Sequence, residues 1–153
     1  MKVKIKRLFE DAKLPTKAHD DDAGFDLYAH SKSFDDADNV VYGVGVAFEI
    51  PKGFVGLLFP RSSNAKKDLL LSNSVGVLDR GYRGEVLFKF KRTPKEFADA
   101  RGAFMTFQYS SGYAIGDRIG QIIIMPYPEI EFVEVDELSE TERGAGSYGS
   151  SGK

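Results

Sequence analysis

The sequence contains no cysteine and no tryptophan, and only two histidines among its 153 residues. Without cysteine the chain can form no disulfide, no thiolate zinc site and no thiol nucleophile. It does not need a disulfide to fold, because a domain of this size buries roughly two thirds of the surface that its unfolded chain exposes. A cysteine-free chain suits a reducing compartment, so we expect a cytoplasmic protein.

Long apolar runs and a strong charge of either sign are also absent. The run Ile122–Met125 is far shorter than the roughly 20 apolar residues of a membrane helix. The first nine residues alternate charged and apolar side chains, unlike a secretory signal. The formal net charge of -2 gives no broad basic field for nucleic acid. We therefore expect no membrane, no stable nucleic-acid binding, and only a local phosphate site.

Apolar residues instead recur with a period of two along several short segments. Val44, Val46, Phe48 and Ile50 alternate with other residues, as do those of Glu85-Val86-Leu87-Phe88-Lys89-Phe90 and of 130–135. This alternation places one face of a strand in a core and the other toward solvent. Many short strands between Gly, Pro and Asp turns predict an all-β, jelly-roll-like barrel or sandwich.

The predicted organisation is one β-barrel domain over 1–142, followed by a flexible Gly/Ser-rich tail over 143–153. At most one short helix is expected, near 94–101. Thr93 suits its N-cap, Pro94 its first position and Glu96 its third, which together form a capping box.

Five segments carry residue types that a generic β-sandwich does not require. Arg61 and Arg143 can bind phosphate through two N–H groups at once. Asp26 and Asp79 offer hard oxygen atoms that suit magnesium or the orientation of water. Serine hydroxyls and backbone N–H groups near glycine add anion donors. The segments, which together supply the parts of a phosphoryl-transfer site, are 23–29, 60–63, 73–85, 116–121 and 143–152.

In order and spacing, these segments resemble the five motifs of the trimeric dUTPase family, and the resemblance covers essentially the whole chain. One motif would be weak evidence, whereas five in order are strong evidence. The resemblance implies a jelly-roll-like barrel of the dUTPase β-clip type. It implies Mg²⁺-dependent hydrolysis of dUTP to dUMP and pyrophosphate. It further implies a homotrimer, in which the tail of one chain covers a site built by the other two.

The resemblance also assigns roles to individual residues. Asp79 matches the catalytic aspartate that orients and deprotonates the attacking water. Asp26 matches the aspartate that holds magnesium through its water shell. Both aspartates have a purely structural alternative, because Asp is favoured in turns.

For the substrate, Tyr82 matches the aromatic residue that packs under the deoxyribose and excludes a 2′-hydroxyl. Asn73 matches the residue that reads uracil, whose amide can donate and accept together. The remaining positions expected to bind substrate are Arg61, Ser62, Ser63, Val77, Leu78, Leu87, Gln121, Arg143, Tyr148, Ser150 and Ser151. The tail departs from the family pattern, because Ser147, Tyr148 and Ser151 stand where Gly, Phe and Thr are usual.

Two other functions remain as alternatives. A dCTP deaminase shares the fold but needs a catalytic glutamate where this chain has Lys89, and lysine cannot replace that carboxylate. A nucleotide-responsive regulatory binding protein could use the 92–112 insert as a docking site for a protein partner, because inserted loops often carry function. Asp117 and Arg118 are expected to pair with each other or across subunits.

Overall fold

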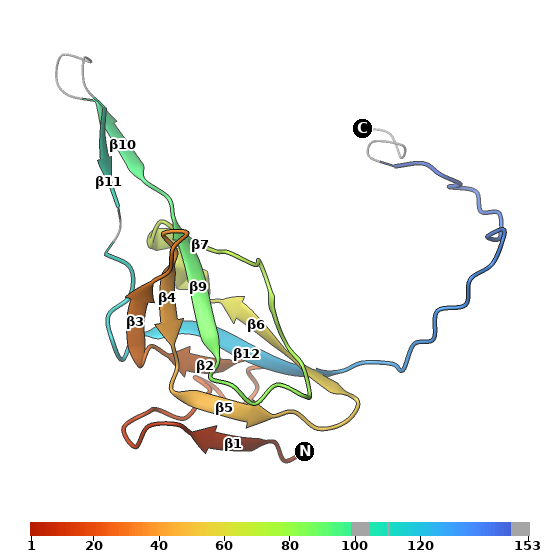
Figure 1. The fold of residues 1–153 in the computed structure, drawn as a ribbon, viewed down its shortest axis with the longest axis horizontal. Helices are drawn as coiled ribbons and strands as arrows, with labels where there is room; N and C mark the ends of the chain where they lie inside the picture. Colours follow the sequence, from red (N-terminus) through yellow and green to blue (C-terminus); the bar gives the residue numbers. More distant parts are fainter. Residues whose placement is uncertain (99–104, 110, 148–153) are drawn as a thin grey trace.

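The computed structural model describes residues 1–98, 105–109 and 111–147, and it is nearly all β (Figure 1). Its elements, in chain order, are β1 (Lys4–Arg7), β2 (Phe25–Tyr28), β3 (Ser31–Phe34), β4 (Val40–Gly43), β5 (Val46–Glu49), β6 (Phe54–Pro60), the 3-10 helix η1 (Ser62–Lys66), β7 (Leu69–Leu71), β8 (Gly76–Leu78), β9 (Leu87–Arg92), β10 (Lys95–Ala98), β11 (Met105–Gln108) and β12 (Arg118–Pro126). Within these ranges, no helix is long and apolar enough to cross a membrane.

Two four-stranded antiparallel sheets form the body of the molecule. Their strand orders are β2-β12-β6-β8 and β3-β4-β9-β7, while β1 with β5 and β10 with β11 make two-stranded sheets. The period-two segments lie where the sequence predicts them, since Val44, Val46, Phe88 and Phe90 are buried. The all-β, jelly-roll-like prediction is confirmed.

An aromatic cluster joins the second sheet to the segment that leads into β12. The ring of Tyr42 lies edge-on to Phe90 and Tyr113, at 6.0 Å from each centroid. The Tyr42 hydroxyl donates to the carbonyl oxygen of Tyr113 at 3.1 Å and accepts from its N–H at 2.7 Å. Burial raises the pKa of both phenols, so both remain neutral hydrogen-bond donors. This cluster fixes the approach of the chain to β12.

The predicted helix near 94–101 is wrong. Lys95–Ala98 forms β10, which pairs antiparallel with β11 so that Glu96 lies opposite Phe107. The Thr-Pro-x-Glu pattern is a local signal, and Pro94 is tolerated at the start of a strand as well as of a helix. A helix of about eight residues is marginal without packing, whereas the hairpin satisfies its own backbone. The hairpin projects from the body in Figure 1.

The segment after β12 leaves the body and runs away from it as an extended arm of residues 127–147 (Figure 1). Its alternating apolar residues predict a strand, but in this single chain the described arm pairs with no other strand. Five large apolar side chains are consequently exposed, with Phe132 at 94%: Ile130, Phe132, Val133, Val135 and Leu138.

Candidate active site

A polar pocket of about 320 Å³ opens at one face of the first sheet. It contains four of the predicted site residues: Asp26, Arg61, Ser62 and Gln121. The sheet explains why these residues meet. Strand β12 lies between β2 and β6, so Gln121 stands opposite Asp26 on one side and Phe59 on the other. Arg61 and Ser62 follow directly on the end of β6, at the same edge.

The guanidinium of Arg61 is held in place inside this pocket. Its Nε donates to Asp26 Oδ1 at 2.8 Å, and its Nη1 donates to Ser63 Oγ at 3.4 Å. The side chains of Arg61 and Asp26 are only 26% and 12% exposed. A guanidinium carries five N–H donors, so these two bonds leave others that can meet an anion. Ser63 therefore acts beside Arg61 rather than among the residues that line the pocket.

The loop that carries these donors is anchored by two residues that the sequence did not reveal. Asn64, buried within η1, donates from Nδ2 to the carbonyl oxygen of Leu69 at 2.7 Å. The Tyr113 hydroxyl donates to Asn64 Oδ1 at 3.3 Å. The only sequence signal is an asparagine within a polar loop, and its burial depends on Tyr113, 49 residues away in the chain. These bonds fix the backbone on which Ser62 lies.

A second pocket, of about 210 Å³, forms where β8 ends and β9 begins. Six predicted residues line it: Asn73, Val77, Leu78, Asp79, Tyr82 and Leu87. Strand β8 pairs with β6, while β9 pairs with β4 and β7, so β8 and β9 do not form a hairpin with each other. The pocket thus lies where the chain crosses from one sheet to the other.

The crossing between the sheets is closed by its own hydrogen bonds. The Tyr82 N–H donates to the carbonyl oxygen of Asp79 at 3.1 Å, and the Tyr82 hydroxyl donates to that of Glu85 at 2.8 Å. Glu85 Oε1 in turn accepts from the N–H of Gly45 at 2.7 Å. The Tyr82 ring remains 44% exposed at the pocket. Asp79 therefore begins a turn, while its exposed side chain lines the pocket.

The two pockets share no lining residue among the described parts of the chain. Leu58 of β6 lines one pocket, and Arg61, three residues later, lines the other. The candidate anion donors and the candidate water-activating carboxylate are thus in separate pockets of a single chain.

Of the predicted tail residues, Arg143 is described, and it lines neither pocket in this chain. Arg143 lies in an exposed turn, where its Nε donates to the carbonyl oxygen of Gly146 at 3.2 Å. Tyr148, Ser150 and Ser151 lie outside the described residues.

Within this chain, Asp117 and Arg118 bind other partners than each other, and their pairing across subunits stays a prediction. Asp117 Oδ2 accepts from the N–H of Ala114 at 2.9 Å, which closes a turn before β12. Arg118 instead donates from Nη1 to Asp26 Oδ2 at 3.1 Å. Asp26 is therefore bound by two arginines.

Two carboxylates, Asp22 and Asp26, line the polar pocket. Across the described residues, no group of three His, Cys, Asp or Glu side chains could hold a metal ion. Magnesium dehydrates reluctantly and is commonly bound by one or two carboxylates, waters and substrate phosphates. The donor set fits magnesium held in that way.

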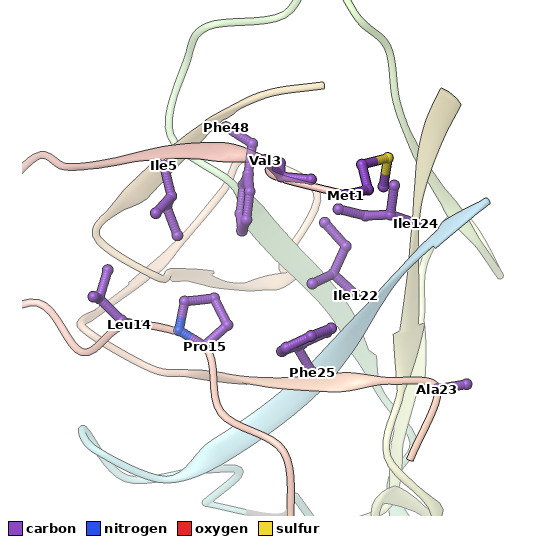
Figure 2. Close-up of a pocket in the computed structure, with 10 residues that line it drawn as sticks. All are labelled: Met1, Val3, Ile5, Leu14, Pro15, Ala23, Phe25, Phe48, Ile122 and Ile124. Atoms are coloured by element: carbon purple, nitrogen blue, oxygen red, sulfur yellow. The ribbon is translucent and has the colours of Figure 1, made fainter. Parts of the chain in front are cut away.

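A third, apolar pocket of about 340 Å³ lies between β1 with β5 and β2 with β12. Figure 2 shows side chains from these four strands and from the segment before β2 converging on one space. It is lined by Met1, Val3, Ile5, Leu14, Pro15, Ala23, Phe25, Phe48, Ile122 and Ile124. No charged side chain is among them, so this pocket suits an apolar surface rather than a phosphate.

Lys89 occupies the position that a deaminase would give to glutamate. It lies on the exposed face of β9, and its Nζ is 3.2 Å from Asp35 Oδ2. Hydrogen bonds from Asn39, followed by the contact with Lys89, lower the pKa of Asp35. Lys89 therefore belongs to a surface ion pair.

The chain was compared with known protein families and with curated proteins. A model of the dUTPase family matches residues 10–152. The chain is 38% identical over 151 residues to a deoxyuridine 5′-triphosphate nucleotidohydrolase of Tropheryma whipplei (strain Twist), covering 97% of this chain and 95% of that one. It is 35% identical to the corresponding protein of Nautilia profundicola, covering 100% of both.

Solved structures give the same result. The dUTPase of Staphylococcus bacteriophage 80alpha, determined with dUPNHPP, superposes with a TM-score of 0.78 at 30% identity and 99% coverage of both chains. A variant of that enzyme, studied for the link between enzymatic activity and SaPI-inducing capacity, gives 0.76 at 28%, with 97% and 98% coverage. A variant dUTPase of phage phi11 of S. aureus, described with a structural Mg(II) ion, gives 0.67 at 27%, with 90% and 98% coverage.

Gly24 lies against Gln121, and a Cβ atom there would overlap Gln121 Oε1. Gly24→Ala should displace the Gln121 amide and lower the affinity for inorganic pyrophosphate about tenfold, because a charge-assisted donor is lost. Isothermal titration calorimetry measures the change. Gly81→Ala is the control, since its Cβ would meet open space. Equal affinities for the two variants would show that the placement of Gln121 does not matter.

Proposed function

Since the chain belongs to the dUTPase family, we propose that it hydrolyses dUTP to dUMP and pyrophosphate by attack of water on the α-phosphorus. The observation that carries this proposal is the pocket in which Asp79 meets Asn73 and Tyr82. The reaction limits uracil in DNA and supplies dUMP for dTMP synthesis. We place it in the cytoplasm, whose reducing conditions suit a cysteine-free chain.

Asp79 acts as the general base of this reaction. Its carboxylate accepts a proton from water while the water oxygen forms a bond to the α-phosphorus. The bond from that phosphorus to the bridging oxygen breaks, and pyrophosphate leaves with the electron pair. The exposed position of Asp79 at the rim of its pocket gives water access to the carboxylate.

The polar pocket holds the phosphate groups. Arg61, Ser62 and Gln121 donate hydrogen bonds to oxygen atoms whose charge grows as pyrophosphate departs. Asp26 would hold magnesium through its water shell, and the ion would offset part of that charge. Ser63 supports Arg61 from the side.

The second pocket selects the nucleoside. The exposed ring of Tyr82 packs under the deoxyribose and leaves no room for a 2′-hydroxyl. Asn73 pairs with the edge of uracil, while Val77, Leu78 and Leu87 border the base. A site built to pair with one pattern of donors and acceptors discriminates strongly, because the wrong base leaves buried polar groups unpaired.

A complete site requires more than one chain, and we assign it to a homotrimer. The anion donors and Asp79 line separate pockets, so a substrate that meets both is best accommodated where two subunits adjoin. The tail of a third subunit then covers the nucleotide through Arg143, Tyr148, Ser150 and Ser151.

The apolar pocket and the extended arm support this assembly. The arm exposes the apolar side chains of Ile130, Phe132 and Val133, while the pocket offers an apolar lining. Burial of such side chains stabilises an interface by about 1.5–3 kcal/mol each. The arm of one subunit therefore packs on the apolar pocket of another.

Replacement of Asp79 by Asn tests the catalytic role. Pyrophosphate release from dUTP should fall by about 10²- to 10⁴-fold, while dUPNHPP should still bind, because the amide keeps the shape of the side chain. dCTP, dTTP and UTP serve as substrate controls, and Asp36→Asn, an exposed carboxylate elsewhere, serves as the variant control. Full activity of Asp79→Asn would refute the role, and no release from dUTP by the folded wild type would refute the function.

Phe132→Ser tests the assembly. Sedimentation velocity should show loss of the trimer at micromolar concentration, because the most exposed apolar side chain of the arm is removed. Glu131→Ser changes the neighbouring residue without removing apolar surface, and it should remain trimeric. A trimeric Phe132→Ser variant with normal stability would show that the arm does not hold the subunits together.

The β10–β11 hairpin favours a second function, the binding of a protein partner by the 92–112 insert. This hairpin pairs only within itself and projects from the body (Figure 1). The phage 80alpha dUTPase, a structural neighbour, has SaPI-inducing capacity.

Replacement of residues 95–108 by a short Gly-Ser turn should retain hydrolysis of dUTP and abolish any SaPI induction that the wild-type chain causes in staphylococcal cells. The matched control is the Asp79→Asn variant, which keeps the hairpin. If the wild type and the hairpin variant induce equally, the insert is not the docking site, and if neither induces, this class of partner is excluded.

A further inference from the structure

Asp26 is the meeting point of two arginines. Arg61 reaches Oδ1 from the end of β6, and Arg118 reaches Oδ2 from the start of β12. The backbone of Asp26 is also fixed, because its N–H donates to the carbonyl oxygen of Thr16 at 2.7 Å. The Asp26 side chain is 12% exposed, so its orientation depends on these partners.

Arg118 reaches Asp26 because of an irregularity in β12. Gln121 and Gly120 stand opposite Asp26 and Leu27, but Arg118, rather than Ile119, stands opposite Tyr28. Side chains alternate between the faces of a regular strand, so Arg118 would otherwise lie on the face opposite to Gln121. The extra residue is a β-bulge, a feature that redirects side chains near active sites.

Burial on the other face agrees with this interpretation. Ile119 is fully buried in the core, and a Cβ atom on Gly120 would overlap the ring of Phe88. Two successive residues of β12 therefore face the core. Arg118 and Gln121, on either side of them, both face the polar side of the sheet, where Asp26 lies.

The charges of Asp26, Arg61 and Arg118 explain why the contact between Arg118 and Asp26 matters for phosphate binding. Asp26 lines the phosphate pocket, where an uncompensated carboxylate would repel a triphosphate. Arg118 does not line the pocket but pairs with Asp26 from outside it. Arg61 and Arg118 together balance the two carboxylates of the pocket, Asp22 and Asp26, while Arg61 keeps N–H donors that can meet phosphate.

We propose that Arg118, aimed by the bulge in β12, is a positioning residue that holds Asp26 so that Arg61 presents its remaining donors to the phosphates. This inference rests on the proposed function, because it assigns the phosphates of dUTP to the polar pocket.

Arg118→Gln should weaken the binding of dUPNHPP about tenfold. The variant loses the charged hydrogen bond to Asp26, and Asp26 in turn orients Arg61 toward the phosphates. Binding of deoxyuridine, which has no phosphate, should stay within about twofold of wild type. Arg7→Gln, a matched loss of one exposed arginine on β1, should change neither affinity. Isothermal titration calorimetry at fixed magnesium measures all three.

A double-mutant cycle supplies the second readout. In an Asp26→Asn background, Arg118→Gln should weaken dUPNHPP binding less than about twofold, because the carboxylate through which Arg118 acts is gone. Arg118→Lys keeps the charge but loses the planar fork, so it should give a loss between wild type and Arg118→Gln. If Arg118→Gln does not fold, the affinity of Arg118→Lys for dUPNHPP is measured in its place.

Three results would overturn the proposal: unchanged binding of dUPNHPP, an equal loss for deoxyuridine, or the same loss in both backgrounds. Failure of the proposed function is distinct from these, because it would show as wild-type protein that releases no pyrophosphate from dUTP. In that case, the comparison of wild type with Arg118→Gln for binding of dUPNHPP still decides the role of Arg118.

Discussion

The pairing of β12 with β2 on one side and β6 on the other determines where the anion-binding groups lie. Asp26 comes from one neighbour, Arg61 follows the other, and Gln121 stands between them on β12 itself. The register of β12 with β2 and with β6 therefore also fixes how far apart Asp26, Arg61 and Gln121 lie. Because β-strand register moves in whole-residue steps that exchange the two faces, a shift in either pairing would remove the cluster altogether.

In the proposed reaction, the phosphates and the nucleoside meet two pockets with different physical demands. The polar pocket needs fixed charges, and it obtains them from partly buried groups that bind one another. The nucleoside pocket needs shape, and it lies in a crossing between sheets that is closed by Tyr82 and Glu85. Neither region forms an enclosed site in the single chain, so in the proposed trimer the arrangement of subunits becomes part of the chemistry.

Much of the fold and of the candidate site could be predicted from the sequence, because the two-residue period of strands and the order of motifs can be read directly along the chain. Phe88 and Phe90 are buried as their alternation indicates, and the predicted catalytic residue Asp79 shares one pocket with five residues predicted to bind substrate. The errors arise where tertiary structure decides. Pro94 introduces a strand rather than a helix, and the bulge at Ile119 gives Arg118 a partner that alternation does not predict. Asn64 depends on distant Tyr113, which no local pattern reveals.

In the proposed trimer, the exposed arm makes the stability of this protein a function of its concentration. A folded single chain presents the side chains from Ile130 to Leu138 to water, and water disfavours that surface. The proposed packing of the arm on another subunit removes that surface from water, so the free energy of unfolding gains a term that grows with the amount of protein. Dilution thus acts on this molecule as a mild denaturant does, and a cell that makes few copies holds a less stable enzyme than one that makes many.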